Sequence, residues 1–260
     1  MQFNNNPYGQ QHQQQPSELF PSLWGDQESL DRAISSCLAK VFMRMFAALL
    51  VTAAISFGIS QSPGAIDAMV SNPVLLFGPL VLQIIIALVL SFRVMKMSPA
   101  VSNVMFFVYA ALMGVTLSII FIAYELGTIF QAFAISALMF AAMAIYGTIT
   151  RRDLTRIGSL CFMALIGIII ASVVNMFFWN EMMFVIVNYI GVLVFVGLTA
   201  YDTQKIKRWL AEANSGSQDS IFADNQDDAV KKISVMGALI LYLDFINLFL
   251  RILAILGRRR

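Results

Sequence analysis

The segment ISVMGALILYLDFINLFLRILAIL, residues 233–256, decides the fold. Apart from the side chains of Asp244 and Arg251 it is an almost unbroken apolar run. At about 1.5 Å per residue, a helix of this length crosses the roughly 30 Å hydrocarbon core of a bilayer. The run does not alternate with period two, which excludes a strand of a membrane β-barrel. Because backbone groups in lipid must be satisfied within the segment, the run must be a transmembrane helix.

Six further apolar segments precede this one, and each predicts another membrane-spanning helix. They cover approximately residues 41–60, 74–92, 101–123, 129–148, 159–178 and 183–201. The composition agrees, since 59% of the 260 residues are hydrophobic and 12% are charged. Ordinary soluble domains have about 45–50% and about 25%, respectively. We therefore predict an all-α membrane protein with seven transmembrane helices.

The remaining residues are predicted to form tails and short connections. Residues 1–25 begin with a Gln- and Asn-rich stretch and are predicted to be a disordered cytoplasmic tail. Residues 26–257 form the predicted transmembrane domain, and the three arginines at 258–260 form a basic C-terminal tail. Within the domain, residues 26–39 are expected to form a short helix at the membrane surface, with Asp26 as its cap.

Basic residues are distributed unequally between the connections. Thirteen of them flank the first span or lie in the connections after the second, fourth and sixth spans, whereas the other three connections carry acidic residues alone. The thirteen are Arg32, Lys40, Arg44, Arg93, Lys96, Arg151, Arg152, Arg156, Lys205, Lys207, Arg208, Lys231 and Lys232. The positive-inside rule therefore places the N-terminus and these connections in the cytoplasm.

The last segment departs from this pattern, because a full crossing carries the arginines at 258–260 to the outside. Either the basic tail is translocated or the segment turns back within the membrane. We favour a true span, since six earlier spans have already fixed the orientation and the segment is strongly apolar.

Ionisable groups inside a membrane are costly and are candidate functional residues by default. Asp244 lies near the middle of the last segment, and Asp202 ends the sixth. Consecutive spans are antiparallel and commonly adjacent, so the two carboxyl groups are expected to approach each other. Asn247 and Arg251 follow Asp244 at helical spacing and share its face. The alternative is that Asp244 is a structural tie between helices, or that it pairs with Arg251.

Two arginines are possible counter-charges for the aspartates. Arg93 lies at the cytoplasmic end of the second span, and Arg44 lies in the first turn of the first span. Either side chain can instead extend to the membrane interface, which is the commoner arrangement for arginine at a helix end.

Several chemistries have no support in the sequence. It contains no phosphate-binding glycine loop, no Cys or His cluster with metal-ligand spacing and no histidine suited to a catalytic triad. We therefore predict that the protein is not an enzyme, has no cofactor and no metal site, and does not bind nucleic acid.

Three motifs resemble those of one family. They are GLTAYDTQKIK at residues 197–207, ALILYLDFINLFLRIL at residues 238–253 and YGTITRRDL at residues 146–154. Their order and places in the topology are similar to those of a bacterial member of the Bax inhibitor-one family, also called the transmembrane Bax inhibitor motif family. The resemblance covers the membrane portion, from about residue 40 to residue 257.

The resemblance implies both an architecture and a function. It implies six helices around a central C-terminal helix, in a multi-pass protein of the bacterial inner membrane. It implies a pH-sensitive calcium leak, with Asp202 and Asp244 as the pH-sensing pair and Arg93 as the nearest match to an arginine that can pair with them. Some bacterial members are reported as modulators of a membrane-bound protease.

We therefore expect a cation leak channel, with Ca²⁺ as the transported ion, controlled by a buried aspartate pair. Two neighbouring carboxyl groups in a low-dielectric site share a proton and titrate as one unit. One alternative is a non-conducting regulator that binds another membrane protein, such as a membrane-bound protease. A less favoured alternative is an intramembrane aspartyl protease, since Asp244 lacks the adjacent glycine that those enzymes show.

Overall fold

The computed structural model of the protein describes residues 20–214 and 226–257, and within these ranges every regular element is a helix. Seven helical segments are long and apolar enough to cross a membrane, and each contains one of the seven predicted segments to within one residue. The prediction of an all-α protein with seven spans is therefore confirmed. In chain order the elements are α1 (Phe20–Ser60), α2 (Pro63–Ser71), α3 (Pro73–Arg93), the 3-10 turn η1 (Val94–Lys96), α4 (Pro99–Leu117), α5 (Ile120–Ala123), α6 (Leu126–Ile149), α7 (Thr155–Phe177), α8 (Glu181–Asn214) and α9 (Gln226–Gly257).

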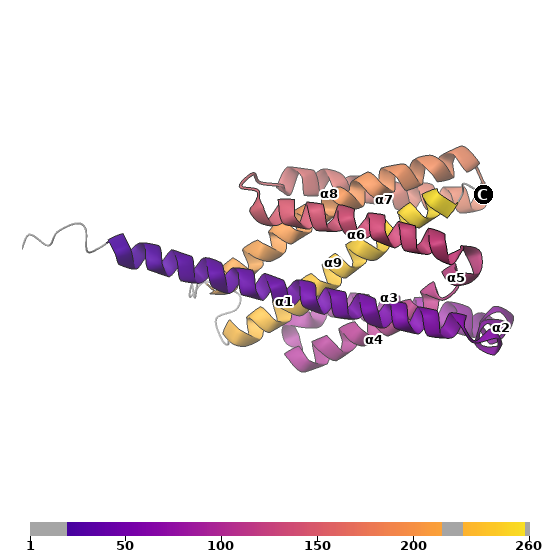
Figure 1. Ribbon diagram of the computed structural model, residues 1–260, viewed down its shortest axis with the longest axis horizontal. Coiled ribbons are helices and arrows are strands. Elements are labelled where there is room, and N and C mark those ends of the chain that lie inside the picture. Colours follow the sequence, from indigo (N-terminus) through magenta and orange to yellow (C-terminus); the bar gives the residue numbers. More distant parts are fainter. Residues whose placement is uncertain (1–19, 215–225, 258–260) are drawn as a thin grey trace, which may run out of the picture.

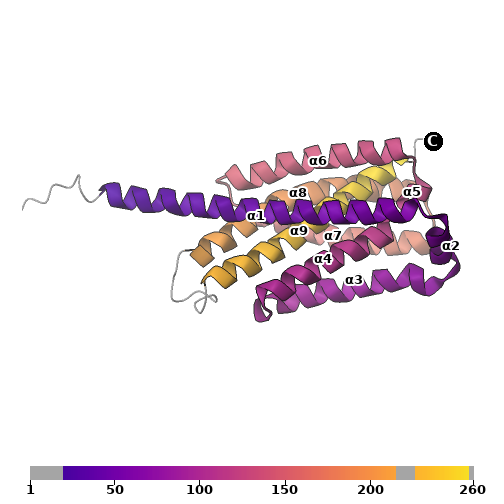
Figure 2. The same cartoon turned by 60° about the horizontal axis from the view of Figure 1, so that its bottom comes forward.

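Helix α1 is much longer than the first predicted span. It runs without a break from Phe20 to Ser60, and its N-terminal part projects beyond the other helices (Figures 1 and 2). The expectation of a separate surface helix at residues 26–39 is therefore wrong, because no proline or glycine between Asp26 and Phe57 interrupts the helix. The helix also includes residues 20–25, which were expected to belong to the tail, while residues 1–19 lie outside the described residues.

Prolines and caps determine where the next helices begin. The Asn72 side chain accepts a hydrogen bond from the Val74 amide at the start of α3, and Pro73 occupies the first turn. Ser98 caps α4 in the same way, with Pro99 in the first turn. Proline suits this position because its missing N–H has no partner there in any helix. The short helix α2, between the first two spans, was not predicted from the sequence.

Helix α9 is the most buried of the seven spans. In its most apolar stretch 56% of the residues are buried, whereas 11% are buried in the corresponding stretch of α7. It contacts α1, α4, α6 and α8, and both views show it passing diagonally between α1 and α6 (Figures 1 and 2). The last helix is therefore the most enclosed of the seven spans. The complete ring of six helices around it stays an expectation from the family resemblance.

Three of the basic connections lie at the same end of the bundle. The Lys232 ammonium group donates to the Met95 carbonyl, which joins the start of α9 to η1. Lys207 of α8 donates to the carbonyl of Thr148 near the end of α6. Gly257, at the other end of α9, contacts the Tyr124 ring between α5 and α6. Helix α9 therefore crosses the whole bundle, which agrees with a true span, while residues 258–260 lie outside the described residues.

Glycines allow close helix packing at three positions inside the spans. A Cβ atom added to Gly114 would lie 2.8 Å from the Thr52 carbonyl oxygen, and one added to Gly197 would lie 2.7 Å from the sulfur of Cys161. At Gly191 the added atom would lie 3.0 Å from the Arg251 side chain. A Cβ atom added to Gly167 would have no atom within 4 Å, so this glycine does not serve close helix packing.

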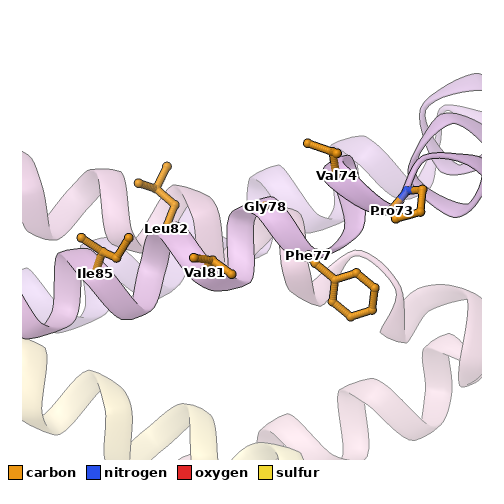
Figure 3. Close-up of a pocket in the computed structure, with 7 residues that line it drawn as sticks. All are labelled: Pro73, Val74, Phe77, Gly78, Val81, Leu82 and Ile85. Carbon is orange, nitrogen blue, oxygen red and sulfur yellow. The ribbon is translucent and has the colours of Figure 1, made fainter.

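The outer surface of the bundle is apolar over large areas. The outward face of α3 is an example (Figure 3), where a shallow hollow is lined by residues of this one helix: Pro73, Val74, Phe77, Gly78, Val81, Leu82 and Ile85. Large exposed apolar side chains on a monomer mark contact with lipid or with another protein. Because the hollow has no inner wall from a second helix, we regard it as part of the lipid-facing surface.

Candidate functional site

The two aspartates selected from the sequence meet where α8 packs against α9. Asp202 lies on α8, three turns before its end, and Asp244 lies in the middle of α9. Asp244 is 5% exposed, whereas Asp202 is partly exposed. Their carboxyl groups lie within hydrogen-bonding reach of each other. The structure thus brings together two carboxyl groups that are separated by the whole α8–α9 connection in the sequence.

The pair lines a cavity of about 520 Å³ between α7, α8 and α9. Helix α7 contributes a small residue, Gly158, where a Cβ atom would collide with the Tyr201 ring. This close approach of α7 to α8 forms one wall beside the pair. The other lining residues are Thr155, Ser159, Phe162, Leu165, Leu198, Tyr201, Lys205, Ile240, Leu243 and Asn247.

A hydrogen bond between two carboxyl groups requires a proton on one of them, because an ionised carboxylate has no donor. The second carboxyl oxygen of Asp244, Oδ2, is buried and has no hydrogen-bond partner among the described residues. Lys205 of α8 and Cys161 of α7 are the other titratable groups that interact electrostatically with Asp202. The site can therefore hold one proton between two oxygens, and loss of that proton leaves two like charges in contact.

Asn247 and Arg251 lie on the same face of α9 as Asp244, but they line different cavities. Asn247 lines the same cavity, and its amide nitrogen donates to the Leu243 carbonyl of its own helix. Arg251 lines a different cavity of about 410 Å³ near the other end of α7 and α8. It donates to the side-chain oxygen of Asn188 at 3.3 Å. Arg251 is thus engaged with α8 rather than with Asp244.

The two candidate counter-charges differ in their surroundings. Arg93 is exposed in the last turn of α3, and the structure assigns it no contact with the aspartate pair within the described part of the chain. Arg44 is half-buried on α1, and one of its guanidinium nitrogens is buried without a hydrogen-bond partner among the described residues. The charge that acts on Asp202 is instead Lys205, one turn further along α8.

A polar clamp, Gln204 and Arg208, fixes the C-terminal part of α8 and was not found from the sequence. The Gln204 oxygen accepts from the Leu154 amide at 3.0 Å and from Arg208 at 2.8 Å, while its amide nitrogen donates to the Arg152 carbonyl at 2.8 Å. Arg208 also pairs with Asp153 at 2.6 Å. The clamp therefore holds α8 against the connection between α6 and α7, two residues after Asp202.

Asp153 is the outer partner of this clamp and lies outside the membrane-spanning segments. Hydrogen bonds from the Thr155 hydroxyl and from Arg208 lower the pKa of its carboxyl group well below the usual value. The contribution of these contacts to stability is therefore complete above the ordinary aspartate pKa, and it is lost as the pH falls from there through the lowered pKa of the folded protein. Asp153 stays ionised around neutral pH, so it cannot supply a pH response there.

On the other side of the pair, the Tyr242–Thr52 hydrogen bond anchors α9. The Thr52 hydroxyl lies 3.0 and 2.9 Å from the carbonyl oxygens of Ala48 and Ala110, and 2.7 Å from the Tyr242 hydroxyl. Threonine has one hydroxyl proton, which faces the carbonyls, so Tyr242 acts as the donor. The rings of Phe106 and Tyr109 pack edge-on against Tyr242. This contact joins α1, α4 and α9 two residues before Asp244.

The described residues contain no group of three or more His, Cys, Asp or Glu side chains that could hold a metal ion. The aspartate pair supplies two carboxyl groups, fewer than the six to eight oxygen ligands that bound Ca²⁺ usually takes. The site is thus a carboxyl pair in a cavity rather than a resident metal centre.

These features define a class, the polytopic α-helical membrane proteins with a carboxyl pair on the last two spans. The family model described as "Inhibitor of apoptosis-promoting Bax1" matches residues 34–260, so the chain belongs to the Bax inhibitor-1 family. The resemblance inferred from the three motifs is therefore confirmed.

The chain is similar to bacterial proteins over most of its length. It is 44% identical over 228 residues to the inner membrane protein YbhL of Escherichia coli K12, covering 87% of this chain and 93% of that protein. It is 39% identical over 224 residues to a protein of Borreliella burgdorferi, covering 86% and 92% of the two chains. A Deinococcus radiodurans protein is 35% identical over 230 residues, covering 88% and 93%.

Proposed function

We propose that the protein is a pH-sensitive cation leak channel of the bacterial inner membrane, and that the protonation state of the Asp202–Asp244 pair sets its rate. The observation that carries the proposal is the close approach of the two carboxyl groups in one cavity where α8 meets α9. A charged group in a membrane is costly and is usually retained for a function. Asn or Ser would supply a helix-to-helix hydrogen bond without the pH dependence that two carboxyl groups bring.

The proton between the two carboxyl groups gives the pair two states. At lower pH the proton bridges Asp202 and Asp244 and ties α8 to α9. At higher pH the proton is lost, and the two carboxylates repel each other in a region of low dielectric. Lys205 partly offsets the charge on Asp202, whereas Asp244 has no cation in contact within the described residues. Changing pH therefore changes both the charge of the cavity and the contact between the two helices.

Ca²⁺ is the cation that this chemistry fits as a transported ion. Carboxylate and amide oxygens are its preferred ligands, and both aspartates and Asn247 line the cavity. An ion that is to be released again must be held weakly, and an incomplete ligand set holds Ca²⁺ weakly. Arg251, further along the same face, opposes the passage of cations and is expected to keep the flux slow.

The proposal also includes the membrane in which the protein lies and the orientation of the protein in it. The relative YbhL is named an inner membrane protein, and seven apolar helices suit the same location here. We propose that the N-terminus and the end of the bundle that carries Lys207 and Lys232 face the cytoplasm, because basic connections remain on that side. The aspartate pair then lies closer to the cytoplasmic end of α8.

Purified protein in liposomes loaded with a calcium dye tests the proposal. We expect Ca²⁺ entry above that of empty liposomes, with a rate that changes with pH, and an altered profile in Asp202→Asn. The matched control is Asp67→Asn, at an exposed aspartate of α2, and it should retain the wild-type profile. Wild-type protein that catalyses no Ca²⁺ flux at any pH would favour the non-conducting regulator. Cleavage of a transmembrane peptide that depends on Asp202 would favour the protease.

A further inference from the structure

A cavity of about 740 Å³ lies between α1, α4, α5, α6 and α9, away from the aspartate pair. Its size is within the range of about 300–1,000 Å³ that is usual for small-molecule sites. The lining includes Leu50 and Ser56 of α1, Phe130 of α6 and Phe245 and Phe249 of α9. Almost all of it is apolar, so its occupant must be largely apolar as well.

The cavity reaches from the outer surface of the bundle to the central part of the molecule. On the outside, Leu126 and Phe130 are 62% and 71% exposed, and these side chains face the surrounding lipid. On the inside, Phe245 and Phe249 of α9 are buried. Figure 1 shows α9 passing between α1 and α6, and side chains of these three helices line the cavity. A molecule in the bilayer can therefore enter sideways and touch α9.

One polar group in this cavity has no partner. Ser56 is 2% exposed, and its hydroxyl is buried without a hydrogen bond among the described residues. Buried hydroxyl groups nearly always have a partner, because leaving one unsatisfied costs free energy. Ser56 lies four residues before the end of α1, about 6 Å along a helix that rises about 1.5 Å per residue. For a helix that ends at the membrane surface, this depth is close to the boundary between the headgroup region, about 5–7 Å thick, and the hydrocarbon core.

We propose that this cavity binds one acyl chain of a membrane glycerophospholipid, with the ester carbonyl of the lipid accepting a hydrogen bond from Ser56. The chain lies along the apolar wall formed by Phe130, Phe245 and Phe249. An ester carbonyl occurs at the depth of Ser56 and has no donor of its own, so it complements the free hydroxyl. The inference does not depend on ion conduction, since it rests on the cavity and on Ser56 alone.

A phospholipid that carries a photoreactive diazirine in its acyl chain tests the proposal in reconstituted full-length protein. Mapping of the labelled peptides should find label on α9 at Phe245 or Phe249, which bulk lipid does not reach. Gly127 lines the cavity, and an added Cβ atom meets no atom within 4 Å there, so Gly127→Phe can fill the space. It should reduce the α9 label at least tenfold.

The matched control is Gly167→Phe, at an exposed glycine of α7 that also has no atom within 4 Å of an added Cβ and does not line the cavity. It should leave the α9 label unchanged. A second comparison uses Ser56→Ala with an ester-linked and an ether-linked probe of the same chain length. Wild-type protein should take up the ester probe severalfold better, and Ser56→Ala should remove the difference.

Each of the two experiments has an outcome that would contradict the proposal. Absence of α9 label in the wild type, or equal α9 label in Gly127→Phe and wild type, would show that no acyl chain enters the cavity. Equal labelling by the two probes in wild-type protein would show that Ser56 does not bind the ester carbonyl. If Gly127→Phe does not fold, the comparison of probes in wild type and Ser56→Ala decides alone.

Discussion

Replacing Asp244 by asparagine should hold the pair in the hydrogen-bonded form that the wild type adopts when it carries the shared proton. Asparagine has nearly the same size and shape as a protonated aspartic acid, and its amide nitrogen can donate to the Asp202 carboxylate. The hydrogen bond between α8 and α9 then no longer needs a proton from solution. Flux through Asp244→Asn should therefore keep, at every pH, the rate that the wild type shows on the acidic side of its transition.

The size of the effect follows from the kind of hydrogen bond. A bond to a charged group contributes about 1.5–3 kcal/mol. Since about 1.4 kcal/mol corresponds to a factor of ten, the tied form should be favoured about 10- to 150-fold over the untied form. On the alkaline side of the wild-type transition, the rate in Asp244→Asn should thus be displaced toward the acidic value by about an order of magnitude or more.

The assay is Ca²⁺ flux in dye-loaded liposomes from pH 5 to pH 9, with Asp202→Asn, Asp244→Asn and the double variant measured beside the wild type. Because the two carboxyl groups share one proton, each single change should remove the pH dependence and the double change should add little. Asp244→Leu, which cannot form the bond, should also lose pH dependence but should differ in rate from Asp244→Asn. Single variants that kept the wild-type profile, or shifted it additively, would refute the coupled pair and make Asp244 a structural tie.

Three further predictions concern the surroundings of the pair, and a fourth concerns the orientation of the protein in the membrane. Gln204→Leu removes three hydrogen bonds and leaves the buried Leu154 amide without its partner, so it should lower the free energy of unfolding by about 1–3 kcal/mol in denaturant titration. Tyr242→Phe removes the 2.7 Å bond to α1 and should cost about 0.5–1.5 kcal/mol in the same titration, with the helical circular dichroism unchanged. Arg251→Gln removes a positive charge from the face that also carries the aspartates and should raise Ca²⁺ flux severalfold; an unchanged rate would place Arg251 outside the ion path. In intact cells, a membrane-impermeant thiol reagent should label Asp67→Cys and leave Asp227→Cys unlabelled, and the opposite pattern would reverse the proposed orientation.

The membrane spans and the aspartate pair were predictable because each depends on one strong physical rule. Apolar runs such as residues 233–256 are long enough to cross a bilayer, whichever helices they pack against. A carboxyl group such as Asp244 is conspicuous in such a run because its burial is costly. The surface helix expected at residues 26–39 depended instead on a weak signal for a break, and α1 continues through that region.

The clamp around Gln204 and the anchor at Tyr242 could not be predicted, because each depends on tertiary contacts between distant residues. Gln204 bonds to backbone groups 50 and 52 residues away, and Tyr242 bonds to a side chain 190 residues away. Glutamine near a helix end and tyrosine in an apolar run are both common and give no local indication of a partner. A single sequence reveals a charged residue within an apolar run, but it does not reveal which backbone carbonyl will accept a hydrogen bond from a buried side-chain amide.

These two contacts affect how a change in the pair can act on the bundle. Gln204 fixes α8 against the α6–α7 connection just after Asp202, and Tyr242 fixes α9 against α1 just before Asp244. Both anchors lie within two residues of a carboxyl group. Neither α8 nor α9 can therefore shift far as a rigid body near the aspartate pair. Repulsion between two carboxylates must therefore be relieved where α8 meets α9, by rotation of the side chains or by local widening of the cavity. A small displacement there would open the cavity between α7, α8 and α9 without separating the rest of the helices.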